Sequence, residues 1–224
     1  MRLAVLFSGG KDSCYALQLA EEQHEVACLL SIESENPESF MFHTPNIHLT
    51  KLQAETIGIP ILTKTTPGEK EEELRDLKDL IEKAKAEYAV EGVVTGAIES
   101  VYQASRVQRI CDDLGLWCFN PLWQKDQVEL LNELLDKKFQ VLIIGVFGFP
   151  LDDSFLGKTI DEAMISRLVT LKEKFQINPS GEGGELETFV INAPLFDKAI
   201  SIKKSRVDYS NNSGIFIIDE AGLE

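Results

Sequence analysis

Residues 3–13 read Leu-Ala-Val-Leu-Phe-Ser-Gly-Gly-Lys-Asp-Ser, and this stretch decides the fold. Its first five residues form a continuous apolar run, which is typical of a buried strand. Two glycines follow, and residues 12–22 then place Cys14, Leu17 and Ala20 on one face of a helix. The stretch therefore predicts a strand, a tight loop and a helix in direct succession.

Six consecutive residues have the composition of an anion-binding loop: Ser8, Gly9, Gly10, Lys11, Asp12 and Ser13. The glycines permit backbone conformations closed to other residues and let a phosphate approach the main chain. The helix that follows directs unpaired N–H groups and the positive end of its dipole at the same point. The serines add hydroxyl donors and Lys11 adds a positive charge. Asp12 is an anion, so its expected role is to hold Mg²⁺ against phosphate oxygens. The loop therefore predicts ATP binding.

Two other nucleotide-binding motifs do not fit this sequence. The P-loop requires Gly-x-x-x-x-Gly-Lys-Ser/Thr and the dinucleotide fingerprint requires Gly-x-Gly-x-x-Gly. Neither pattern occurs in the chain. A strand-to-helix turn without a ligand is the remaining alternative, but six consecutive residues suited to one task favour the phosphate site.

The first two-thirds of the chain alternates apolar strands with amphipathic helices. Strands are predicted at residues 3–7, 25–32, 59–63, 92–95 and 141–145, and helices at 12–22, 47–57, 69–88 and 101–114. This alternation implies crossover connections and a parallel sheet covered on both faces. We therefore predict an α/β fold with a doubly wound, mostly parallel sheet.

The pattern changes after residues 147–150, Phe-Gly-Phe-Pro. A helix is predicted at 160–175, followed by β-prone residues at 188–191 and strands near 198–202 and 214–218. We expect an ATP-binding domain at residues 1–148 and a smaller α+β domain, for substrate binding, at residues 149–224.

Acidic residues outnumber basic ones by 37 to 22, which gives a formal charge of −15. Proteins that grip nucleic acid along its backbone normally present a basic face, so no direct nucleic-acid partner is expected. No apolar run approaches the roughly 18 residues of a membrane span, and the first apolar run is too short for a signal peptide. We therefore expect a cytoplasmic protein with no membrane partner.

The loop at residues 8–13 matches in full the signature Ser-Gly-Gly-x-Asp-Ser. In this the chain resembles the PP-loop family of N-type ATP pyrophosphatases, whose fold is adenine nucleotide α-hydrolase-like. Members of that family cleave ATP to AMP and pyrophosphate. They use AMP to activate an oxygen for attack by a nitrogen or sulfur nucleophile. The resemblance implies ATP as co-substrate, together with Mg²⁺.

Further stretches narrow the resemblance: residues 38–44, residues 95–98 leading to Arg106, Leu122-Trp123, and residues 181–188. Together they resemble the diphthine–ammonia ligase family over nearly the whole chain. That family amidates diphthine, a modified histidine on translation elongation factor 2, with ammonium. The resemblance implies an AMP-forming ligase that passes through an acyl-adenylate. The sequence gives no oligomeric state and no source of ammonia.

The resemblance and the chemistry together suggest roles for residues around the nucleotide. Lys11 is expected to stabilise the departing pyrophosphate, and Arg106 to steer a carboxylate or the α-phosphate by bidentate hydrogen bonding. His43 is expected near the adenine. Thr95 and Gly96 end a parallel strand, where open α/β sheets bind ligands. The alternatives are a structural role for His43, a simple turn at Thr95 and Gly96, and a surface ion pair for Arg106.

A second glycine-rich segment is the candidate substrate site: Gly181, Glu182, Gly183, Gly184, Glu185, Glu187 and Thr188. Its carboxylates suit a cation, and diphthine carries a trimethylammonium group. Ammonium would also be attracted and would lose a proton to a carboxylate, so Glu182 and Glu185 are candidate catalytic residues. An exposed hairpin turn made of Gly and Glu is the alternative.

Two other functions are compatible with the loop alone. One is a tRNA-modifying enzyme, which the acidic composition disfavours. Thiolation also needs catalytic cysteines, whereas Cys14, Cys28, Cys111 and Cys118 are scattered and contain no Cys-x-x-Cys pair. The other is a non-catalytic ATP sensor, which would not need the complete set of Lys11, Asp12 and both serines.

Overall fold

The structure, a computed structural model, describes residues 1–36 and 45–224. The chain divides into two units, Met1–Trp123 and Gln124–Glu224. Each unit has its own sheet and its own helices, and the two are described in turn.

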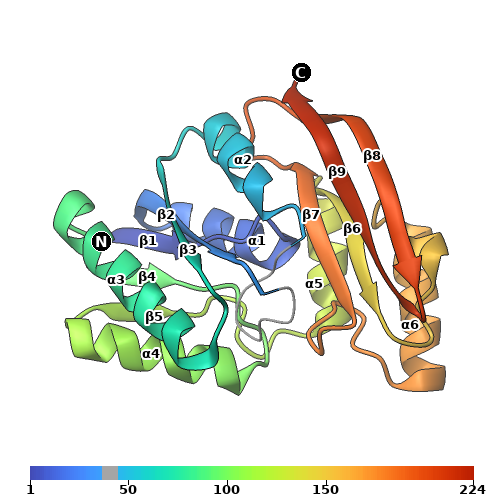
Figure 1. Ribbon diagram of the computed structural model, residues 1–224, viewed down its shortest axis with the longest axis horizontal. Coiled ribbons are helices and arrows are strands. Elements are labelled where there is room, and N and C mark those ends of the chain that lie inside the picture. The colour runs from blue at the N-terminus through green and yellow to red at the C-terminus, as the bar shows by residue number, and fades with distance from the viewer. Residues whose placement is uncertain (37–44) are drawn as a thin grey trace. The chain divides into compact units, whose positions relative to one another are not determined.

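The first unit is an α/β domain with a five-stranded sheet in the order β3-β2-β1-β4-β5 (Figure 1). All neighbouring strands in it are parallel. The strands are β1 (Arg2–Leu6), β2 (Glu25–Ser34), β3 (Ile61–Thr66), β4 (Gly92–Val94) and β5 (Trp117–Phe119). The helices are α1 (Lys11–Glu21), the 3₁₀ turn η1 (Ile47–Leu49), α2 (Thr50–Ile57), α3 (Lys70–Tyr88) and α4 (Val101–Leu114).

Helices cover both faces of this sheet. Ala4 and Leu30 project from the strands into a core that includes Leu77 and Ile81 of α3 and Ile110 of α4. Figure 1 shows α3 and α4 side by side. Alternate strand residues point to the opposite face, where α1 packs against β1, β2 and β4. The predicted doubly wound parallel sheet is therefore confirmed.

The second unit is a smaller α+β domain with an antiparallel sheet in the order β7-β6-β9-β8. Its strands are β6 (Gln140–Phe147), β7 (Leu186–Asn192), β8 (Ile200–Ser210) and β9 (Ser213–Leu223). Its helices are α5 (Gln127–Asp136), the 3₁₀ turn η2 (Asp153–Phe155) and α6 (Glu162–Phe175), and α5 contacts α6 (Figure 1). No helix in the described part of the chain is long and apolar enough to cross a bilayer.

The structure corrects the predicted boundary at residue 148. The strand predicted at 141–145 is β6, which pairs antiparallel with β7 and β9 and belongs to the second unit. A continuous apolar run indicates burial on both faces, but it does not distinguish a parallel from an antiparallel neighbour. Helix α5 and the three-residue strand β5 were not predicted from the sequence.

The order of strands reverses between β1 and β4, which lie side by side in the parallel sheet. The loop after β1 and the turn after β4 therefore meet at the carboxyl edge, where open α/β sheets bind ligands. Gly96 makes this approach possible. A Cβ at position 96 would lie 2.8 Å from the carbonyl carbon of Asp12 and 2.9 Å from the amide nitrogen of Ser13.

We expect side chains at position 96 to destabilise the first unit in order of size. Gly96→Ala should lower its free energy of unfolding by about 1–3 kcal/mol, because the backbone of α1 must move, and Gly96→Val should lower it further. Both tryptophans, Trp117 and Trp123, lie in this unit, so tryptophan fluorescence during urea unfolding measures it. A Gly96→Val protein as stable as the parent would show that the close approach is unimportant.

Candidate functional site

The loop between β1 and α1 is held in shape by its own serines. Ser13 Oγ donates a hydrogen bond to the Gly10 carbonyl at 3.0 Å and accepts one from the Ser8 amide at 3.3 Å. Ser8 Oγ lies 3.3 Å from Ser13 Oγ and 3.5 Å from the Gly10 amide nitrogen. Both hydroxyls, predicted as phosphate donors, therefore also brace the loop internally.

The N-terminus of α1 has the geometry of an anion site. Gly10 is its N-cap residue, and within the described residues no side chain caps the helix there. The first amides of a helix lack intrahelical partners and carry the positive end of its dipole. Oriented N–H groups at the start of α1 are therefore directed at the point where the loop turns.

Lys11 and Asp12 form an ion pair inside this site, with Lys11 Nζ 2.8 Å from Asp12 Oδ2. The side chain of Lys11 is 3% exposed and that of Asp12 is 29% exposed. Asp12 Oδ1 is buried and has no hydrogen-bond partner among the described residues. A buried carboxylate oxygen without a partner is costly, so the arrangement suits a bound cation or donor at Oδ1.

Gln53 of α2 belongs to the site although it was not predicted from the sequence. Its Nε2 donates a hydrogen bond to the Gly9 carbonyl at 2.9 Å, and the residue is fully buried. Gly9 has φ +77°, and a Cβ there would lie 2.2 Å from Gln53 Oε1. Nothing in the local sequence of Gln53 indicates this contact, which links residues 44 positions apart.

Thr95 and Gly96 directly follow β4 at the carboxyl edge of the parallel sheet, and the nucleotide contact expected there stays a prediction. Thr95 Oγ1 donates a hydrogen bond to Asn120 Oδ1 at 2.5 Å and accepts one from the Ala97 amide at 3.1 Å. Its hydroxyl is therefore used to shape the turn after β4. Gly96 lies directly against the first turn of α1, where the short distances from a Cβ at this position leave no space for a side chain.

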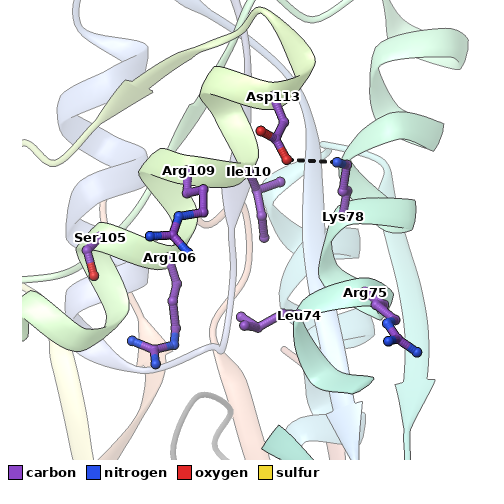
Figure 2. Close-up of a pocket in the computed structure, with 8 residues that line it drawn as sticks. All are labelled: Leu74, Arg75, Lys78, Ser105, Arg106, Arg109, Ile110 and Asp113. Carbon is purple, nitrogen blue, oxygen red and sulfur yellow. Dashed lines mark hydrogen bonds and ion pairs between the residues drawn. The ribbon is translucent and has the colours of Figure 1, made fainter. Parts of the chain in front are cut away.

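Arg106 lies on α4 and lines a pocket of about 350 Å³ between α3 and α4 (Figure 2). Its guanidinium carbon lies 3.4 Å from the centre of the Tyr102 ring, and Nη1 donates a hydrogen bond to the Tyr102 carbonyl at 3.1 Å. Arg106 Nε is buried and has no partner among the described residues. Among the residues that the structure describes, no hydrogen bond or ion pair joins Arg106 to the loop at residues 8–13.

The pocket around Arg106 is basic in an otherwise acidic protein. Figure 2 shows Arg75 and Lys78 from α3 and Arg109 from α4 around it, with Lys78 paired to Asp113 at 2.9 Å. The alternative of a surface ion pair for Arg106 is not seen among the described residues, where its contacts are those to Tyr102. The predicted residue His43 lies outside the described residues.

In the second unit, the predicted segment forms two successive turns that lead into β7. The Gly181 amide donates to the Asn178 carbonyl and the Gly184 amide to the Gly181 carbonyl, each at 2.9 Å. Gly181 and Gly184 both have φ +82°, which glycine adopts without strain. Glu187 and Thr188 follow within β7, opposite Gly145 and Ile143 of β6.

Asn178 holds the carboxylate of Glu185 in place. Glu185 Oε1 accepts hydrogen bonds from Asn178 Nδ2 at 3.0 Å and from the Asn178 amide at 3.3 Å. Its Oε2 is buried and has no partner among the described residues. The segment therefore consists of two ordered turns and one carboxylate that Asn178 holds in place.

Three of the four cysteines, Cys14, Cys28 and Cys111, do not have the properties of catalytic nucleophiles. Burial raises the pKa of the Cys14 thiol and raises that of Cys28 to about 12. Cys111 and Cys118 share a hydrogen bond, which raises the pKa of Cys111 and lowers that of Cys118. Cys14, Cys28 and Cys111 are buried. Thiols with raised pKa values inside the core are poor nucleophiles.

Comparison with known proteins covers both units. Residues 1–118 match the family model for the diphthamide synthase N-terminal domain, and residues 126–223 match the model for the C-terminal domain. The gap between the two matched ranges coincides with the division of the chain after Trp123.

Among curated relatives, the chain is 37% identical to a human diphthine–ammonia ligase over 92% of this chain and 85% of that protein. It is 37% identical to the Danio rerio diphthine–ammonia ligase over 90% of this chain and 86% of that protein. The ligase of Schizosaccharomyces pombe is 35% identical over 97% of this chain, which spans 39% of that longer protein. The identities and the two family models agree: the chain belongs to the diphthamide synthase family.

Proposed function

We propose that this protein is a diphthine–ammonia ligase, which amidates diphthine on translation elongation factor 2 with ammonium, in the cytoplasm. ATP would be cleaved to AMP and pyrophosphate. The observation that carries the proposal is the loop at residues 8–13 at the start of α1, where buried Lys11 is paired with Asp12. The relatives named diphthine–ammonia ligase support the choice of acceptor.

The first unit would bind the nucleotide. The amides at the start of α1 would receive phosphate oxygens, and the Lys11 ammonium would stabilise the charge that develops on departing pyrophosphate. Gln53 and the two serines would keep the loop in this shape before the nucleotide arrives. Preorganised donors of this kind lower the barrier because they need no rearrangement during the reaction.

Asp12 is the residue we propose for Mg²⁺. Its Oδ1 is a buried carboxylate oxygen without a partner among the described residues, which fits a hard cation. Mg²⁺ is commonly held by one or two carboxylates together with substrate phosphates. When bound, it would neutralise phosphate charge beside Lys11.

The reaction would proceed in two displacements. A diphthine carboxylate oxygen forms a bond to the α-phosphorus, and the bond to the bridging oxygen of the β-phosphate breaks, so that pyrophosphate leaves. Ammonia then attacks the carbonyl carbon of the acyl-adenylate, and AMP leaves with the bonding electron pair. Ammonium must first give up a proton, which Glu182 or Glu185 would accept.

The second unit would bind the acceptor through the segment at residues 181–188. Its carboxylates, from Glu182, Glu185 and Glu187, match the positive charge of the trimethylammonium group. Arg106 in the first unit would bind an anionic group, a carboxylate or the α-phosphate, through its planar guanidinium.

The reaction itself is testable with purified components. The protein, ATP, Mg²⁺, ammonium and elongation factor 2 carrying diphthine should give stoichiometric amide and AMP, measured by mass spectrometry and chromatography. Elongation factor 2 without diphthine is the control acceptor. AMP formation that requires tRNA instead would identify an RNA-modifying enzyme, and ATP binding without turnover would identify a sensor.

Asp12→Ala should reduce AMP formation more than it reduces nucleotide affinity. Loss of a metal-holding carboxylate affects the transition state, and we expect turnover to fall at least about 100-fold, on the scale of losing one electrostatic group. Nucleotide affinity should fall roughly tenfold or less, because the helix amides and Lys11 remain. Unchanged turnover would contradict the proposal that Asp12 binds Mg²⁺.

Arg106→Lys keeps the positive charge but loses the planar guanidinium group, which can donate two parallel hydrogen bonds to a carboxylate or phosphate. If Arg106 binds a carboxylate or phosphate in two-point fashion, turnover should fall by roughly 10- to 100-fold, the loss of about 1.5–3 kcal/mol from a charge-assisted bond. The matched control is Arg75→Lys, a neighbouring arginine on α3 with no proposed role. Equal activity of Arg106→Lys and the parent would contradict the assignment.

A further inference from the structure

A relay of two hydrogen-bonded side-chain amides, Gln127 and Asn178, connects α5 to the turns before β7. Gln127, the first residue of α5, accepts hydrogen bonds from Ser180 Oγ at 2.8 Å and from the Ser180 amide at 3.2 Å. Its Nε2 donates to Asn178 Oδ1 at 3.1 Å. Gln127 and Ser180 are both buried. The relay therefore links residues more than 50 positions apart through hydrogen bonds that are buried at Ser180 and partly buried at Asn178.

The direction of every bond in this relay follows from the charge of Glu185. An ionised carboxylate only accepts, so Asn178 must present its NH₂ group to Glu185 and its carbonyl oxygen to Gln127. Gln127 must then donate with Nε2, which leaves Oε1 to accept from Ser180. One orientation of both amides satisfies all these contacts.

The backbone at Gly183 lies directly against the carboxylate of Glu185, where no side chain would fit. A Cβ at position 183 would lie 2.6 Å from each carboxylate oxygen of Glu185 and 2.5 Å from Asn178 Nδ2. A Cβ at position 181 would lie 2.3 Å from the Leu186 carbonyl oxygen. Glycine at both positions therefore allows the backbone to approach the carboxylate and the start of β7.

The relay supplies hydrogen-bond donors to one carboxylate oxygen of Glu185 but not to the other. Oε1 has two donors from Asn178, whereas the buried Oε2 has none among the described residues. A buried carboxylate oxygen gains most from a partner that is both positively charged and a hydrogen-bond donor. Ammonium has both properties. A trimethylammonium group has the charge but no N–H to donate.

We propose that Gln127 and Asn178 act as a clamp that positions Glu185, and that Glu185 Oε2 binds the ammonium co-substrate and accepts its proton. The proposal rests on the proposed function and names the ammonium site within it. Ammonium donates one N–H to Oε2, the proton passes to the carboxylate, and neutral ammonia remains with its lone pair free to attack. Gln127 and Asn178 are positioning residues in this step.

Gln127→Glu tests the clamp without changing the size of the side chain. Glutamate cannot donate to Asn178 Oδ1, so the Asn178 amide must rotate, and its carbonyl oxygen then faces Glu185. We expect the KM for ammonium to rise roughly tenfold or more, the cost of one lost charge-assisted hydrogen bond. The KM values for ATP and for the protein acceptor should stay within about twofold, below the scale of one such bond.

Hydroxylamine distinguishes the ammonium role from other roles of the same residues. It is uncharged at neutral pH and attacks an acyl-adenylate without first losing a proton, so it needs no carboxylate. Gln127→Glu should keep hydroxamate formation within about twofold of the parent while losing amide formation from ammonium. Asn132→Asp is the matched control, because it adds one negative charge to an exposed position of α5.

Equal loss of activity with ammonium and with hydroxylamine would overturn the ammonium assignment. A raised KM for the acceptor with an unchanged KM for ammonium would also overturn it.

The clamp has a test that does not depend on activity. Gln127→Glu and Glu185→Gln should each lower the melting temperature. The double variant should recover part of the loss, because a glutamine side chain at position 185 can donate to the rotated Asn178 amide. Additive losses would overturn the clamp even if the parent protein made no amide.

Discussion

The contact between Gly96 and the first turn of α1 is the constraint on which the nucleotide site depends. The turn after β4 and the start of α1 approach so closely that even a methyl group at position 96 would meet the backbone of Asp12 and Ser13. This approach places the start of α1, which no side chain of the described residues caps, at the point where the strand order of the parallel sheet reverses. The loop amides, Lys11 and Asp12 are therefore concentrated at the carboxyl edge of β1 and β4.

In each unit, a buried glutamine forms hydrogen bonds to a glycine-rich turn. Each unit contains a glycine-rich turn whose charged side chain must be held without free rotation. In the first unit, buried Gln53 fixes the turn through the Gly9 carbonyl. In the second, buried Gln127 fixes the turn through Ser180 and Asn178. A glutamine supplies a donor and an acceptor on one side chain, so it can set both the position and the polarity of a turn.

Much of the first unit could be predicted from the sequence. The glycine loop has strong local signals, and α4 begins and ends at the predicted residues 101 and 114. The boundary at residue 148 was wrong because β6 is apolar throughout, and such a run looks the same in either kind of sheet. Gln53, Gln127 and Asn178 were missed because their importance comes from contacts between elements far apart in the chain.

The central claim is that the loop at residues 8–13 supports attack of a carboxylate oxygen on the α-phosphorus of ATP. The most direct measurement uses elongation factor 2 whose diphthine carboxylate is labelled with ¹⁸O. Mass spectrometry of the released nucleotide should find one ¹⁸O atom in AMP, because the attacking oxygen remains on phosphorus when ammonia displaces AMP. Unlabelled AMP, or ADP as the product, would contradict the account.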